Sequence, residues 1–330
     1  MRNFVFLPVL LCILTAFIQC RPESPRYQDG FCSIGTEQLN TAMVHWSALY
    51  QSQNPTETLH LQHEGRGSLV GPAALLSGTC DLAPMSRPMP ADQLQKFQDR
   101  FGALPLGIPV AVEALVLAIP AEVPLREISM PQIRQIFGNT PASWSAINNL
   151  SLPSSWNQRD LKACGINSAA DRYQWMKRSI LEGHYGDRVL ELRDWQSQRS
   201  ALQTGSCDIT YLRPAEVSAA ALQPDSAAAG DTLRPLTMVP TLTDATGAIA
   251  ASPDNIQSGR WPLSRYYYMY LPPASSRSVS GRTLAFVRMI LSDPGQAILD
   301  NIGLYALNSK DRRASLQQLL QYSTPAEPSR

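Results

Sequence analysis

The chain is organised around the stretch Glu64-Gly65-Arg66-Gly67-Ser68, which is followed further along by Met85-Ser86-Arg87-Pro88-Met89. The two glycines of the first stretch let the backbone adopt conformations barred to other residues and approach a ligand closely. Ser68 is a candidate cap for a helix that would include Leu69, Leu75 and Leu76. A glycine turn then leads into a short apolar strand that ends at Ser86 and Arg87. The order loop, helix, turn, strand and loop is typical of an open α/β sheet.

The pattern of these two loops favours the binding of an anion. A capped helix start offers free N–H groups and the positive end of the helix dipole. The ends of strands in α/β sheets are where ligands commonly bind. The simpler interpretation is that Ser68 only caps a helix and that Arg66 and Arg87 are solvated surface charges.

The flanking segments repeat the alternation of strand and helix. A strand is expected from Gly30 to Ile34, a helix after the candidate cap Thr36, and a second strand from Leu59 to Gln62. Because His60 and His63 would point to opposite faces of that strand, a shared metal ion is not expected. No cofactor or metal is predicted elsewhere, since the chain has no Cys-x-x-Cys pair.

Two long apolar strands lie far apart in the sequence. The run from Gly107 to Pro120 fits a strand buried on both faces, and Arg265 to Leu271 is a second one by its aromatic content. They could form a two-strand crossing between lobes. The segment from Pro214 to Ser258, rich in Ala, Pro, Asp and Thr, is expected to be irregular.

A short internal repeat suggests two lobes of similar construction. Ala74 to Ala83 and Ala201 to Thr210 each place a helix end, a glycine turn and Cys-Asp before an apolar strand. Cys80 and Cys207 would then be equivalent core positions in separate lobes. Buried free thiols are expected for all four internal cysteines of the exported chain, namely Cys32, Cys80, Cys164 and Cys207.

The N-terminus has the features of an export signal. One arginine, Arg2, precedes an apolar run from Phe4 to Ile18 that is too short for a stable membrane span. We therefore expect residues 1–20 to be a signal peptide and the protein to be periplasmic or secreted. Cys20 is a candidate for lipid attachment, and plain cleavage nearby is the alternative. The formal net charge of +1 gives no global field for nucleic acid.

These residues together resemble the periplasmic phosphate-binding proteins of phosphate-uptake ABC transporters. Gly35 to Asn40 is similar to the family's first ligand loop, and the two stretches quoted first are similar to its second ligand region. The resemblance implies a two-lobed type II periplasmic-binding-protein-like fold, with an open mixed sheet in each lobe and two crossing strands as a hinge. It implies one lobe of residues 27–114 plus 268–330 and another of 115–267.

The third ligand loop departs from the family. Ile166 stands where an arginine is expected, and Ala170-Asp171-Arg172 stand where Ser-Gly-Thr is expected. Ser168 is a candidate cap for the helix that follows it, and Asp171 would repel an anion at that helix start. Arg172 would supply the missing cation or pair with Asp171. The residues expected to bind ligand are Thr36, Arg66, Gly67, Ser68, Ser86, Arg87, Ser168 and Arg172.

Three functions follow from these observations. The leading one is a monomeric solute-binding protein, without catalysis, that captures a small oxyanion, phosphate above all, for an ABC transporter permease. The alternative keeps the fold but uses it for another ligand or a partner protein, because the third loop is altered. An enzyme is the weakest of the three, since the chain has no Gly-x-Ser-x-Gly elbow and no histidine in a nucleophile motif.

Overall fold

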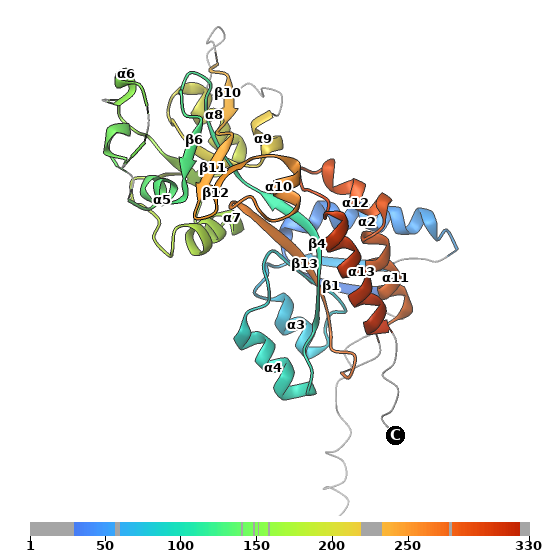
Figure 1. The fold of residues 1–330 in the computed structure, drawn as a ribbon. Helices are drawn as coiled ribbons and strands as arrows, with labels where there is room; N and C mark the ends of the chain where they lie inside the picture. Colours follow the sequence, from blue (N-terminus) through green and yellow to red (C-terminus); the bar gives the residue numbers. More distant parts are fainter. Residues whose placement is uncertain are drawn as a thin grey trace, which may run out of the picture.

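The computed structural model describes residues 30–56, 60–139, 141–147, 149–150, 152–157, 159–218, 233–276 and 279–323. Figure 1 shows two lobes, with two long strands running from one to the other. These strands are β4 (Leu106–Ala114) and β13 (Ser264–Leu271), which pair antiparallel from Leu106↔Leu271 to Ala114↔Ser264. The expected pair of crossing strands is therefore present.

The first lobe is built on a mixed sheet. β1 (Gly30–Gly35) runs parallel to β2 (His60–Gly65), and the N–H of Ile34 donates to the carbonyl of Leu82 beside β3 (Ala83–Met85). β3 in turn pairs antiparallel with β13. The helices of this lobe are α2 (Asn40–Gln53), α3 (Gly71–Ser77), α4 (Ala91–Phe101), α11 (Gly281–Ile290), α12 (Asp293–Asp300) and α13 (Ser309–Ser323).

The second lobe repeats this plan. β5 (Val116–Pro120) lies antiparallel between β9 (Thr210–Leu212) and β10 (Leu236–Met238). β7 (Cys164–Ile166) runs parallel to β8 (Leu190–Leu192) and is linked to the start of β9 by a bridge between Ala163 and Ile209. The lobe also contains β6 (Glu127–Ser129), β11 (Thr241–Asp244) and β12 (Gly247–Ala250) in a small sheet, and the helices α5 (Met130–Arg134), α6 (Ser154–Asn157), α7 (Asp171–Trp175), α8 (Trp195–Thr204), α9 (Pro214–Ser218) and α10 (Pro253–Gln257).

The repeated Cys-Asp segments occupy matching places in the two lobes. The N–H of Asp81 donates to the carbonyl of Cys32 (2.8 Å), and the Asp81 carboxylate accepts the N–H of Cys32 (3.0 Å). Asp208 makes the same two bonds to Lys162, at 2.8 and 3.0 Å. Each aspartate thus ties the turn after a helix to the neighbouring strand. Gly78 and Gly205 end the two helices in the left-handed conformation, with φ of 81° at both.

The expectation of four free thiols is wrong for two of the cysteines. Cys164 on β7 and Cys207 before β9 form a disulfide, so they are not free thiols. The two chain segments are already adjacent, because the N–H of Cys164 donates to the carbonyl of Ile209. In the first lobe Cys32 keeps a half-buried thiol, whose pKa is raised by burial and by the nearby Asp81 and Glu64 carboxylates.

Three expectations about local structure are also wrong. Ser68 and Ser168 cap no helix, because α3 begins after Val70 and α7 after Ala170, without a side-chain cap. Within 214–258, the described residues form helices and strands instead of irregular structure. The long apolar run breaks at Leu115, whose N–H donates to the carbonyl of Leu263 and whose carbonyl accepts the Trp261 indole N–H.

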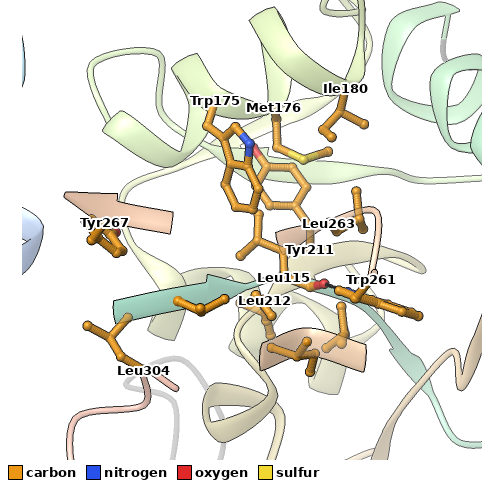
Figure 2. Packing of buried hydrophobic residues seen from close by; sticks show 14 of the residues in the cluster. Leu115, Trp175, Met176, Ile180, Tyr211, Leu212, Trp261, Leu263, Tyr267 and Leu304 are labelled. Atoms are coloured by element: carbon orange, nitrogen blue, oxygen red, sulfur yellow. Dashed lines mark hydrogen bonds between the residues drawn. The ribbon is translucent and has the colours of Figure 1, made fainter. Parts of the chain in front are cut away.

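The core extends from the hinge strands into both lobes. Figure 2 shows Trp175 and Met176 projecting from the helix at α7 toward Leu115 and Tyr211. Trp175 is 8% exposed and Met176 is fully buried. The helix that begins at Asp171 is therefore fixed against the hinge by its own buried face. In the described part of the chain, no helix has the length and apolar character needed to cross a bilayer.

Candidate functional site

The first lobe brings three of the predicted residues together. The hydroxyl oxygen of Ser68 accepts the N–H of Ser86 at 3.0 Å, and the two hydroxyl oxygens lie 3.0 Å apart. Both serines are buried. Thr36 is also buried and caps the short turn Glu37–Leu39 by accepting the N–H of Gln38. Thr36 is tied to the same strand end by its N–H, which donates to the carbonyl of Pro84.

The glycine loop presents backbone donors. Gly67 has a φ of 84°, a conformation that favours glycine. Within the described residues, the N–H groups of Gly67, Ser68 and Leu69 donate to no protein acceptor. Such a run of unpaired amides suits an anion.

The two predicted arginines of the first lobe differ in their exposure and in their partners. Arg66 pairs with Glu64 at 2.6 Å, and its side chain is 65% exposed, as expected for a solvated ion pair. Arg87 is half-buried and has no hydrogen bond or salt bridge to any described residue. Burial and the nearby Arg178 guanidinium lower the pKa of Arg87, while Asp171 and Asp92 act in the opposite sense. Arg87 is thus a half-buried cation beside a second cation.

A buried carboxylate on the hinge organises the arginines of the second lobe. Glu113 of β4 is fully buried and accepts from Arg265, its cross-strand neighbour on β13, and from Arg213, at 2.6 and 2.7 Å. Arg172 lies 3.9 Å away, and the Tyr267 hydroxyl donates to Glu113 at 2.9 Å. Burial by itself would raise the pKa of Glu113, but the three guanidinium groups outweigh it and hold the pKa well below its usual range.

Arg172 neither pairs with Asp171 nor stands open to a ligand. Its guanidinium makes two bonds of 2.9 Å to the two carboxylate oxygens of Glu216, and the side chain is buried. This bidentate pair holds α7 against α9. Of the two roles expected for Arg172, the structure shows neither, and its charge is already balanced.

Asp171 connects the two lobes. The Ser86 hydroxyl donates to one oxygen of its carboxylate at 2.9 Å, and Arg265 donates to the other at 2.6 Å. Ser86 belongs to the first lobe, Arg265 to a hinge strand and Asp171 to the second lobe. Asp171 was expected to repel an anion at this helix start. In the structure its carboxylate instead accepts from Ser86 and Arg265, two donors that could also bind an anion.

The third loop is already occupied by protein groups. The N–H of Ser168 donates to the Glu191 carboxylate at 3.1 Å, and the N–H of Ala169 donates to the side-chain oxygen of Asn167. Glu191 also lines a surface hollow of about 530 Å³ together with Tyr173 and Tyr185. The N–H of Ser168 therefore already has a carboxylate partner.

The sequence reasoning missed Glu113, Arg178 and Arg265 as parts of this site. One signal was present for Arg178, which follows Asp171 at the spacing of two turns of a regular α-helix. No local pattern marks Glu113, because its partners come from three distant segments, around Arg172, Arg213 and β13. Among the described residues, no group of three His, Cys, Asp or Glu side chains is placed to hold a metal ion.

Comparison with known proteins identifies the family. The sequence pattern of the PBP superfamily domain matches residues 28–294. The chain belongs to the PBP superfamily. The phosphate-binding protein PstS of Pseudomonas aeruginosa is 26% identical over 314 residues, covering 90% of this chain and 91% of the relative. PstS of Staphylococcus haemolyticus is 19% identical over 285 residues, covering 84% and 81%.

Solved structures share the fold of this chain at low sequence identity. A possible phosphate-binding protein of Planctomyces limnophilus aligns with a TM-score of 0.66 at 14% identity, over 89% of this chain and 99% of that one. An ABC-type phosphate transport receptor of Vibrio cholerae aligns with a TM-score of 0.64 at 13% identity, over 84% and 99%. The expected two-lobed PBP-like α/β fold is confirmed.

Proposed function

We propose that this PBP-superfamily chain is an exported receptor that captures a small oxyanion, phosphate above all, between its lobes for an ABC transporter. The observation that carries the proposal is that Ser86 of the first lobe and Arg265 of the hinge both donate to the Asp171 carboxylate of the second lobe. A place where donors from the first lobe and the hinge already hold two anionic oxygens suits a tetrahedral oxyanion. The relatives named as phosphate-binding proteins support phosphate as the ligand.

The charges around this place also support an anion. The Arg178 guanidinium of the second lobe is close enough to Arg87 of the first lobe to help lower the pKa of Arg87. An anion between them would relieve that repulsion. We therefore propose that Arg87, Ser86 and the loop of Gly67 and Ser68 bind the ligand from the first lobe. Arg265 would be added from the hinge and Arg178 from the second lobe.

The remaining parts of the proposal follow from this role. The chain would act by binding, without catalysis, as a monomer. Its lobes would comprise residues 27–114 plus 268–330, and residues 115–267. The signal peptide of residues 1–20 and the candidate lipid attachment at Cys20 lie outside the described residues. Delivery to a permease and the periplasmic or secreted location belong to the same proposal.

Arg87→Ala tests the ligand and the site together. Titration calorimetry with phosphate, sulfate and arsenate should detect binding by the unaltered protein, and phosphate should raise its melting temperature. Because a hydrogen bond to a charged group contributes about 1.5–3 kcal/mol, the variant should bind phosphate about tenfold or more weakly.

Arg100→Ala is the matched control, since it removes an exposed arginine of α4 in the same lobe. It should leave phosphate binding unchanged. If the unaltered protein gives neither heat nor a melting shift with any oxyanion, the proposed function is wrong.

A further inference from the structure

Asp171 contacts the first lobe through one carboxylate oxygen and the hinge strand β13 through the other. Oδ1 accepts from the Ser86 hydroxyl at 2.9 Å and Oδ2 accepts from Arg265 at 2.6 Å. Bonds to a charged partner are about twice as strong as bonds between neutral groups. The pair therefore holds the first lobe and the hinge to the start of α7.

The donors on Asp171 are fixed by their own neighbours. The N–H of Ser86 donates to the Ser68 hydroxyl oxygen, which keeps the Ser86 side chain at the strand end. Arg265 is held by Glu113 and stacks on the Trp175 ring at 4.4 Å. Because these donors are oriented in advance, any anion that replaced the carboxylate would meet them already in place.

The Asp171 carboxylate can turn away from Ser86 and Arg265. The Asp171 side chain is 22% exposed, while the helix behind it is anchored by buried Trp175 and by the Arg172–Glu216 pair. A rotation about the Asp171 side-chain bonds would free Ser86 and Arg265 without unfolding α7. Ser86 and Arg265 can thus bind either the Asp171 carboxylate or a solute anion. They cannot bind both at once, because the two negative charges repel each other.

We propose that Asp171 is an internal ligand, which holds the lobes closed in the absence of solute and must be displaced by an incoming oxyanion. This inference rests on the proposed function for the identity of the anion, but the closure itself does not depend on it. Asp171 therefore lowers the affinity for phosphate, and its removal opens the free protein.

The test combines small-angle X-ray scattering with phosphate titration of the full exported chain. Asp171→Ala should increase the radius of gyration of the ligand-free protein, and phosphate should reduce it again. The variant should bind phosphate about tenfold more tightly than the unaltered protein, because one charged competitor is gone. Asp254→Ala, which removes an exposed aspartate from the first turn of α10, should change neither quantity.

Ser86→Ala separates closure from competition. It breaks the first-lobe half of the contact but leaves the carboxylate in place, so it should open the free protein without the gain in affinity. Equal radii of gyration for the ligand-free unaltered protein and Asp171→Ala would overturn the closure. Equal or weaker phosphate affinity in Asp171→Ala would overturn the competition. An opened Asp171→Ala variant with no phosphate binding in either protein would uphold the closure and overturn the proposed function.

Discussion

Glu113 shows how much one buried residue can organise. Its carboxylate is fully buried yet remains charged, because Arg265 and Arg213 each donate to it and Arg172 lies close by. Taking such a charge out of water costs several kcal/mol, and the guanidinium groups offset that cost only while the carboxylate stays ionised. Glu113 stabilises the hinge and also orients Arg265 toward Asp171.

Glu113→Gln should therefore be strongly destabilising. The amide would leave buried arginines without their counter-charge, and breaking a buried ion pair costs about 3–5 kcal/mol. Urea unfolding followed by circular dichroism measures the loss. Glu122→Gln is the control, because it removes a carboxylate from the more exposed pair with Arg234 and should cost about 1 kcal/mol or less. Equal losses in both variants would contradict the role given to Glu113.

The same residue sets a pH dependence. The pKa of Glu113 is lower in the folded than in the unfolded chain, so its stabilisation is fully present above the unfolded value of about 4.3. It is lost progressively as the pH falls below that value, because the unfolded chain then binds a proton that the folded chain excludes. Glu113→Gln should show a shallower fall in stability over this range than the unaltered protein.

At the scale of elements, the same turn between a helix and a strand occurs in both lobes. A helix ends at a glycine, and an aspartate after the turn bonds to the neighbouring strand, at Asp81 and at Asp208. The second lobe adds a covalent link at this point, between Cys164 on β7 and Cys207. The position matching Cys164 in the first lobe is Ile34, since the N–H groups of both donate to the residue after the aspartate.

The disulfide should stabilise the second lobe. It closes a loop with a sequence separation of 43 residues, and such links typically contribute about 2–4 kcal/mol. The double variant Cys164→Ser/Cys207→Ser should lower the melting temperature in differential scanning calorimetry. Cys32→Ser, which alters a half-buried thiol in the first lobe, should have a smaller effect. Alkylation and mass spectrometry without reductant should leave Cys164 and Cys207 unlabelled, and labelling of both would contradict the link.

The alternation of strand and helix could be predicted, and so could the two crossing strands. Their signals are local, in apolar runs such as Val110 to Ile119 and in the aromatic residues of β13. The start of the helix after Ser68 could not be predicted, because the Ser68 hydroxyl oxygen accepts the N–H of Ser86 instead of an N–H of its own helix. The Cys164–Cys207 pairing also depends on contacts between distant segments. The site was predicted on the first lobe, whereas the roles of Asp171 and Arg265 required the fold.

At the scale of the whole molecule, closure depends on a few side chains at the lobe interface. The strands β4 and β13 join the lobes (Figure 1), and Asp171–Ser86 and Arg213–Gln38 connect them side chain to side chain. Hinge proteins change state when the balance of such contacts shifts by a few kcal/mol. A ligand that offers Ser86 and Arg265 a better partner than Asp171 would keep the lobes closed around itself.

The most direct measurement is a crystal structure of the protein grown with arsenate, whose arsenic atom can be located by its anomalous scattering. The account predicts one arsenate between the lobes, within hydrogen-bonding distance of Ser86 and Arg87, with the Asp171 carboxylate turned away from Ser86. An arsenate bound elsewhere, or Asp171 still bonded to Ser86 with no anomalous peak beside it at saturating arsenate, would contradict it.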